Sequence, residues 1–194
     1  MTTKLKDKIK AYDLMLQKHI DKKDFVKINR TFKEREDPIS GFILGLSKTF
    51  LLVQCENEFL LNGYSIIRKD QFDSLRCNKY DHTIKKILKQ EGVIDKNYGI
   101  NISIKLTTWQ TIFRDLKKND YHVIIECEDM DEPLFDIGII KRIGTNSLAI
   151  QYYSPTGLLE NKLTTIPYKD ITIVKFGDRY TTTFRKYLRK SAKK

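Results

Sequence analysis

Cysteine and histidine are scarce in this chain of 194 residues. Their complete set is Cys55, Cys77, Cys127, His19, His82 and His122. An odd number of widely separated cysteines predicts neither a disulfide framework nor a CxxC pair. None of the histidines stands at ligand spacing from another histidine or from a cysteine, so the sequence predicts no zinc site. We expect buried thiols in a reducing compartment.

Long apolar runs and catalytic motifs are also absent. The sequence has no cationic segment leading into an apolar stretch at its N-terminus and no run of about 18 apolar residues. We therefore expect a cytoplasmic protein without a membrane span. It also lacks the GxSxG, HExxH, GxGxxG and P-loop motifs. We predict that the protein is not an enzyme and that it uses no cofactor.

Positive charge predominates, with 36 Lys and Arg against 25 Asp and Glu and a formal net charge of +11. It is concentrated in residues 178–194, where seven basic residues accompany a single acid, Asp178. Such a tail attracts phosphate groups without reading sequence, although a solvated terminus that favours solubility has the same composition. Six acidic residues gather in 126–136 but lack the glycine and the closing Glu of a calcium loop. We expect an acidic loop that faces water there.

One pattern of residues occurs twice. The stretch from Gly41 to Gln54 returns as the stretch from Gly138 to Gln151, with glycine and apolar residues in the same order at a constant offset of 97. After the central hairpin the offset becomes 99, as if the second copy carried two more loop residues near Ser154. We predict one structural unit present twice.

Each unit is predicted to be a helix, about five short strands and a second helix. In the first copy, apolar residues at helical spacing predict helices over 3–23 and 81–90, the second with Asp81 as its N-cap. Asn62-Gly63 is typical of a type I′ turn or a bulge. Alternating apolar residues predict the strands, which cover 25–32, 39–46, 50–54, 59–61, 64–68 and 72–76.

The second copy follows the same plan. Thr107-Thr108 is predicted to cap a helix whose apolar face contains Trp109, and 179–188 is the counterpart of the second helix. The stretch between the copies follows Gly92, contains Gly99 and is expected to be irregular or weakly stranded. The predicted domains are therefore 1–92 and 107–194, joined by a connector over 93–106.

A helix followed by five strongly bent strands resembles the layout of Sm and Sm-like proteins. The glycine and apolar positions of that family's first motif are filled by Gly41, Ile43, Leu46 and Phe50, and in the second copy by Gly138, Ile140, Ile143 and Ser147. The family's Asp and Asn, with which Sm proteins hold an RNA base, are replaced by Ser47 and Leu51, and by Gly144 and Leu148. The family's second motif is reduced as well, to Ile67-Arg68-Lys69, which keeps the Arg, and Ile166-Pro167-Tyr168, which keeps neither Arg nor Gly.

The resemblance implies a mainly β protein with helical extensions. We expect two tandem Sm-like (SH3-like) small β-barrels, each preceded and followed by a helix. An SH3-like barrel of another lineage is the alternative, because any small bent barrel needs alternating apolar residues and a glycine at a sharply curved strand.

The function predicted from these observations is binding without catalysis. The resemblance and the basic tail favour RNA or another nucleic acid as the partner, held by cations and stacking tyrosines. The candidate residues are Lys48, Tyr64, Arg68 and Lys69 in the first copy, Asn146, Tyr168 and Lys169 in the second, and Arg185, Lys186, Arg189 and Lys190 in the tail. The alternative is a scaffold module that self-associates through its edge strands, as Sm-like proteins do when they build rings.

Overall fold

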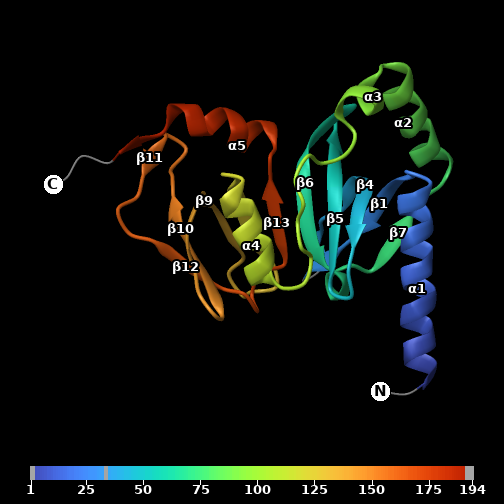
Figure 1. Ribbon diagram of the computed structural model, residues 1–194, viewed down its shortest axis with the longest axis horizontal. Helices are drawn as coiled ribbons and strands as arrows, with labels where there is room; N and C mark the ends of the chain where they lie inside the picture. The colour runs from blue at the N-terminus through green and yellow to red at the C-terminus, as the bar shows by residue number, and fades with distance from the viewer. Residues whose placement is uncertain (1–2, 33–34, 191–194) are drawn as a thin grey trace.

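The computed structural model describes residues 3–32 and 35–190, with side chains described from Tyr12 onward. Lys193 and Lys194 of the basic tail lie outside the described residues, as do the side chains of the first helix before Tyr12. The chain is mainly β, and ten of its strands form one antiparallel sheet with helices packed around it (Figure 1). Among the described helices, none has the length and apolar composition needed to cross a membrane.

Five helices accompany the strands in chain order. They are α1 (Thr3–Asp21), α2 (Lys79–Gln90), α3 (Val93–Asn97), α4 (Trp109–Lys118) and α5 (Arg179–Phe184), with 3-10 turns η1 (Lys69–Gln71) and η2 (Arg185–Tyr187). The large sheet contains β1 (Phe25–Asn29), β4 (Ile39–Leu46), β5 (Phe50–Asn57), β6 (Leu60–Arg68), β7 (Ser74–Arg76), β8 (His122–Cys127), β9 (Leu134–Ile143), β10 (Ser147–Tyr152), β12 (Thr164–Pro167) and β13 (Ile173–Phe176). Two short pairs stand apart, β2 (Thr31–Phe32) with β3 (Arg35–Glu36), and β11 (Leu158–Leu159) with β14 (Arg189–Lys190).

The order of strands across the large sheet is β12-β10-β9-β8-β13-β6-β5-β4-β1-β7. We call β1 and β4 to β7 the first half, and β8 to β10, β12 and β13 the second half. In each half the first four strands are neighbours in chain order, and the fifth returns to lie beside the first. The halves meet where β13 pairs with β6, with Ile173 opposite Ile67 and Phe176 opposite Tyr64.

No closed barrel is seen in the described part of the chain. The two tandem barrels expected from the sequence are therefore not confirmed: the strands of both halves form one continuous sheet, in which the edge of β6 pairs with β13. Pairing of this kind satisfies the backbone groups that an open barrel leaves at its edge.

Equivalent irregularities occur in the two halves. The register between β4 and β5 shifts between Ile43 and Gly45, which leaves Leu44 as an extra residue. The register between β9 and β10 shifts in the same way, so that Lys141 is the extra residue between Ile140 and Arg142. An extra residue bends a strand and increases its twist. Both halves therefore bend at positions that lie 97 residues apart.

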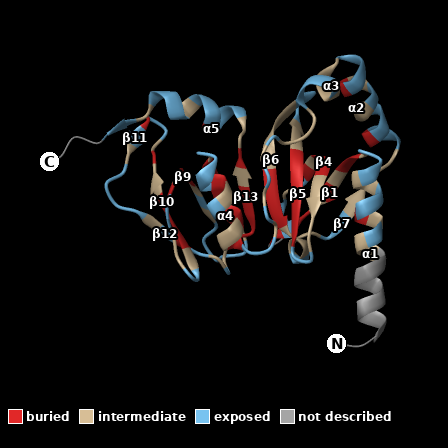
Figure 2. Cartoon of the chain, viewed as in Figure 1, coloured by how far each residue is buried: buried red, intermediate tan, exposed pale blue. Residues whose placement is uncertain are grey.

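Two large hydrophobic cores and two smaller clusters pack against the sheet in the described part of the chain, and buried residues run through the strands of both halves (Figure 2). The apolar face of α4 buries Trp109, Ile112, Phe113 and Leu116. The same core includes Phe50 and Leu52 of β5, so it extends into the first half. The other core is centred on Leu16 of α1, which is 0% exposed against β1 and β5.

Several local predictions are corrected. Asn78, and not Asp81, is the N-cap of α2, and Asp81 completes the capping box from the third helical position. The hairpin turn between β5 and β6 lies at Glu58-Phe59, so Asn62-Gly63 is not the type I′ turn. The bulge alternative is confirmed there, because the register shifts and Asn62 and Gly63 lie opposite Cys55 alone. The connector contains the short helix α3, which follows Gly92 in a left-handed conformation. Thr108 caps α4 as predicted.

Candidate functional site

The two loops that the resemblance singles out in the first half lie against each other. Ser47 closes the turn between β4 and β5, because its hydroxyl accepts hydrogen bonds from the backbone N–H groups of Thr49 at 3.2 Å and Phe50 at 2.9 Å. The backbone N–H of Lys69, just after β6, donates to the backbone oxygen of Thr49 at 2.7 Å. Lys48 is exposed at the tip of the turn.

Acidic side chains hold the other two cations of this loop pair. The Nε of Arg68 donates to Asp70 at 3.0 Å, and the two side chains form an ion pair. The ammonium group of Lys69 pairs with Asp13 of α1 and donates to the backbone oxygen of Ser47 at 3.3 Å. A phosphate group would therefore compete with Asp70 and Asp13 for these cations, whereas the exposed position of Lys48 favours direct contact.

The corresponding loops of the second half also meet. The backbone N–H of Tyr168 donates to the backbone oxygen of Asn146 at 2.9 Å, and its hydroxyl donates to the backbone oxygen of Gly144 at 3.1 Å. One face of the Tyr168 ring stacks on Phe113, with the centroids 6.0 Å apart. Lys169 is exposed beside it. The bond from Tyr168 to Asn146 repeats the bond from Lys69 to Thr49 at the offsets that the sequence predicts.

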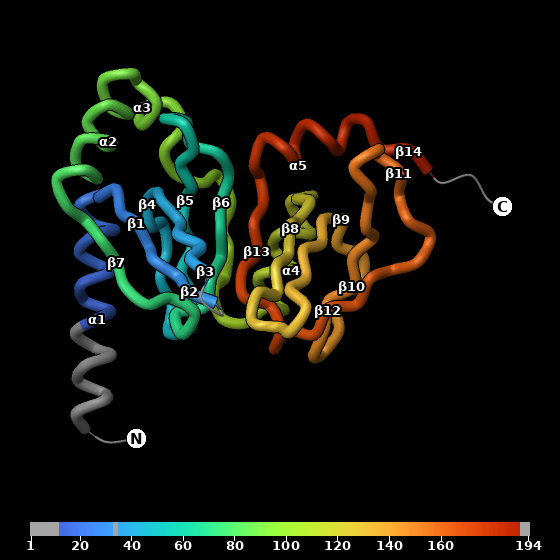
Figure 3. Tube along the Cα trace, turned by 180° about the vertical axis from the view of Figure 1, so that it is seen from behind, coloured from blue at the N-terminus to red at the C-terminus, as the bar shows by residue number. Residues whose placement is uncertain are grey.

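The candidate residues fall at two opposite borders of the sheet. The turns from β4 to β5 and from β9 to β10 lie at the lower border of Figures 1 and 3, whereas α5 runs along the upper border. Arg185 pairs with Asp120 at the upper border, and Arg189 donates to the backbone oxygen of Thr156 at 3.0 Å. Lys186 and Lys190 are exposed. The structure brings the six loop residues to one border and keeps the basic tail away from them.

Tyr64 lies at neither border. Its ring stacks on Phe176 at the junction of the halves, with the centroids 5.3 Å apart, and its hydroxyl donates to the backbone oxygen of Gly99 at 2.8 Å. Burial and, to a lesser degree, Tyr121 raise the pKa of the Tyr64 phenol. Tyr64 therefore packs the two halves together, and one face of its ring is already covered.

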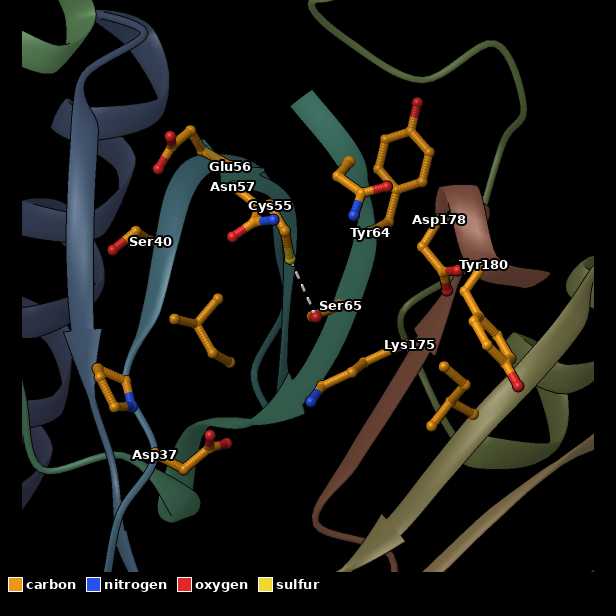
Figure 4. Close-up of a pocket in the computed structure, with 14 residues that line it drawn as sticks. Asp37, Ser40, Cys55, Glu56, Asn57, Tyr64, Ser65, Lys175, Asp178 and Tyr180 are labelled. Carbon is orange, nitrogen blue, oxygen red and sulfur yellow. Dashed lines mark hydrogen bonds between the residues drawn. The ribbon is translucent and has the colours of Figure 1, made fainter. Parts of the chain in front are cut away.

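A pocket of 320 Å³ opens at the junction of the halves (Figure 4). Polar side chains from both halves line it, among them Ser40, Cys55, Asn57, Ser65, Lys175 and Asp178. Lys175 also forms an ion pair with Glu126 at 2.5 Å. The Oδ2 atom of Asp178 is buried without a hydrogen-bond partner among the described residues. The pocket offers both hydrogen-bond donors and acceptors.

The thiol in this pocket is not arranged for nucleophilic chemistry. The Sγ atom of Cys55 lies 3.1 Å from the hydroxyl of Ser65, and burial raises the pKa of Cys55 to about 11. A thiol is a good nucleophile only as the thiolate. Cys55 therefore lines the pocket as a neutral thiol.

A buried arginine connects the halves below the pocket. Arg30 is 0% exposed, donates to Asp37 at 2.8 Å and pairs with Glu128 of the second half. The hydroxyl of Thr172 also donates to Glu128, at 2.8 Å. Burial raises the pKa of the Glu128 carboxyl, and the charge of Arg30 opposes this shift. The sequence predicts that the acidic segment 126–136 faces water. Instead, the side chain of Glu128 in this segment is directed into the junction of the halves.

Sequence reasoning missed two clusters of potential metal ligands in the described part of the chain. The first contains Asp37, Glu126 and Glu128, whose carboxylates already pair with Arg30 and Lys175. The second lies at the end of α1. His19, Asp24 and Cys77 each place a ligand-type atom within 4.8 Å of the other two. His19 and Asp24 are five residues apart, whereas Cys77 comes from a distant segment, which the antiparallel pairing of β1 with β7 brings beside them. The contact of Cys77 with the other two cannot be read from local spacing.

Comparison of the chain with protein-family models, with curated proteins and with solved structures found no match.

Proposed function

We propose that the protein is a non-enzymatic binding protein made of two copies of an Sm-like unit, and that it contacts RNA along the border where the hairpin turns of both copies lie. The observation that carries the proposal is that, in each half, the hairpin turn and the loop after the fourth strand are hydrogen-bonded to each other in the same way. The backbone bond from Lys69 to Thr49 has its counterpart from Tyr168 to Asn146. The shared strand order and the shared bulge support the duplication.

The chemistry of this border suits a flexible strand of nucleic acid. Lys48 and Lys169 are exposed cations on the two halves, able to neutralise phosphates of one strand that runs along both loop pairs. The residues with which Sm proteins hold a base are absent, so we expect weak sequence preference. The basic tail at the opposite border would make a separate, non-specific contact.

Anisotropy titrations with labelled oligo-U, oligo-A and a duplex, each at two salt concentrations, test this proposal. We expect salt-sensitive binding of single strands at micromolar protein. The double variant Lys48→Glu with Lys169→Glu should weaken binding by about tenfold or more and reduce the salt dependence.

Lys186→Glu with Lys190→Glu is the matched control, since it makes the same change of charge at the opposite border. A larger loss in this control than in the loop variant would place the contact on the tail and contradict the proposed border. Absence of salt-sensitive binding by the unmodified chain would refute nucleic-acid binding altogether.

A scaffold function is the second candidate, favoured by the pairing at the junction. The fifth strand of the second half, β13, pairs with the fourth strand of the first half, β6. The complementary strands, β12 and β7, stand at the two ends of the sheet with one described neighbour each. If β12 of one copy paired with β7 of a second copy, the two chains would be joined head to tail in the same way that β6 and β13 join the halves.

Light scattering over a range of protein concentrations tests the scaffold function. We expect a mass that rises above that of a monomer, and a lower association in Thr165→Lys, which adds a charge to an exposed position of β12. A strict monomer at every concentration would remove this candidate and leave RNA binding unaffected.

A further inference from the structure

Three segments of the first half converge at the end of α1. His19 belongs to the last turn of this helix, Asp24 precedes β1, and Cys77 lies between β7 and α2. The pairing of Lys27 with Arg76 brings the start of β1 beside the end of β7. The ligand-type atoms of His19, Asp24 and Cys77 consequently lie within 4.8 Å of one another.

The separations within this cluster suit tetrahedral coordination. The Nδ1 atom of His19 lies 3.0 Å from the Oδ2 atom of Asp24, and the Sγ atom of Cys77 lies 3.5 Å from the Nε2 atom of His82 in α2. Bond lengths of about 2.3 Å to sulfur and about 2.0 Å to nitrogen give a sulfur-to-nitrogen edge of about 3.5 Å in a tetrahedral zinc site. A small closure would place the ligand atoms of His19, Asp24 and Cys77 around one ion. His82 lies outside this group of three but contacts Cys77, which makes it the candidate fourth ligand.

A lysine next to the cluster fixes the orientation of the Asp24 carboxylate. Lys85 of α2 pairs with the Oδ1 atom of Asp24 at 3.1 Å, which leaves Oδ2 directed to His19. Outer partners of this kind orient a metal-binding carboxylate.

The types of side chain in the cluster favour a transition-metal cation. A metal-bound thiol loses its proton, so Cys77 would bind as the thiolate. Nitrogen, sulfur and a single carboxylate are the ligands that zinc prefers over magnesium or calcium.

We propose that His19, Asp24, Cys77 and His82 form a zinc site that fastens the end of α1 to β7 and α2. On binding, zinc occupies the Nδ1 position of neutral His19, whose ring proton is then carried on Nε2, and it displaces the thiol proton of Cys77, which is released to solvent. Four protein ligands make this a structural site. It would hold α1 across the end of the sheet.

Titration of the tag-free, metal-depleted full chain with Zn²⁺ and with Co²⁺ tests the proposal. We expect one Zn²⁺ per chain, a higher melting temperature, and a charge-transfer band of a Co²⁺–thiolate bond. Cys77→Ser should abolish this band and weaken Zn²⁺ binding by at least about tenfold. Cys55→Ser is the matched control and should leave both unchanged, because Cys55 lies in the junction pocket.

His19→Ala and His82→Ala provide tests that do not depend on the folding of the thiol variant. Each should weaken Zn²⁺ binding by at least about tenfold while the circular dichroism spectrum stays that of the unmodified chain. Unchanged affinity in His82→Ala would exclude the four-ligand site. Absence of stoichiometric Zn²⁺ binding, or a charge-transfer band that persists in Cys77→Ser, would overturn the proposal.

Discussion

Glycine at two positions of the repeated pattern is required by contact between backbones. A Cβ atom at Gly41 would lie 1.9 Å from the backbone oxygen of Gln54, and one at Gly138 would lie 2.6 Å from that of Gln151. Neither oxygen can move without breaking the ladder of its strand. Glycine recurs at the two positions because, in each half, the neighbouring strand's backbone leaves no room for a Cβ atom.

We predict that Gly41→Ala and Gly138→Ala each lower the free energy of unfolding by at least about 3 kcal/mol. Gly45→Ala, on the same strand as Gly41, should change it by less than about 1 kcal/mol, since the nearest atom is the flexible end of Leu106 at 3.1 Å. Urea unfolding measures all three. Equal losses in Gly41→Ala and Gly45→Ala would contradict the contact with Gln54.

His122 links stability to pH. Its side chain is 7% exposed, and its Nδ1 atom has no hydrogen-bond partner among the described residues. Burial, then the charge of Arg185, lowers the pKa of His122 below 6.5; Lys141 acts in the same direction and Asp120 in the opposite one. The unfolded chain therefore takes up a proton first as the pH falls.

We predict that the contribution of His122 to stability is complete above its ordinary pKa of 6.5 and is lost as the pH falls from there towards its lower value in the folded chain. In His122→Phe the melting temperature should fall less between about pH 7.5 and pH 5 than in the unmodified chain. The other histidines are present in both proteins and serve as the internal control. The same slope in both would show that His122 is not the group responsible.

At the scale of elements, the predictions succeed where one local pattern decides the structure. Alternating apolar residues correctly locate β4 and β5, and Thr108 correctly marks the start of α4. The turn at Glu58-Phe59 was missed because both residues have positive φ, at 52° and 61°, which neither residue type favours. The pairing of β6 with β13 and the meeting of His19 with Cys77 depend on contacts between distant segments, which no local pattern encodes.

We predict that Glu58→Asn together with Phe59→Gly stabilises the chain by roughly 1 kcal/mol, because Asn-Gly adopts the type I′ conformation without strain. Phe59 is 48% exposed, so its removal sacrifices little burial. Glu58→Ala alone should give no gain, because alanine is also strained at positive φ. Guanidinium unfolding compares the three proteins, and a less stable Asn-Gly variant would show that Phe59 makes a contact outweighing its backbone strain.

At the scale of the whole molecule, the two halves are stabilised by interactions between them. The β6–β13 ladder, the buried pair of Arg30 with Glu128, and the core that joins Phe50 to Trp109 all cross from one half to the other. Removing one partner of a buried ion pair leaves an uncompensated charge. The two halves are therefore expected to unfold together.

We predict that Leu51→Ala, in the core of the first half, lowers stability by about 3 kcal/mol and shifts the unfolding of the second half equally. The fluorescence of Trp109, which packs on Phe50, reports the core shared by the two halves, and far-ultraviolet circular dichroism reports the entire sheet. The two curves should coincide before and after the substitution. A Trp109 transition that stays in place would show that the halves unfold independently.

The β6–β13 pairing also has a consequence for synthesis of the chain. Strand β6 is complete when the ribosome has added Arg68, but its partner begins only at Ile173. At about 5–20 residues per second, the edge of β6 waits roughly 5–20 s for the segment that covers it. During this interval the nascent first half exposes a strand edge that carries Ile66 and Ile67 and that can pair with a neighbouring nascent chain. Crowded polysomes are thus where this fold is most vulnerable to misassembly.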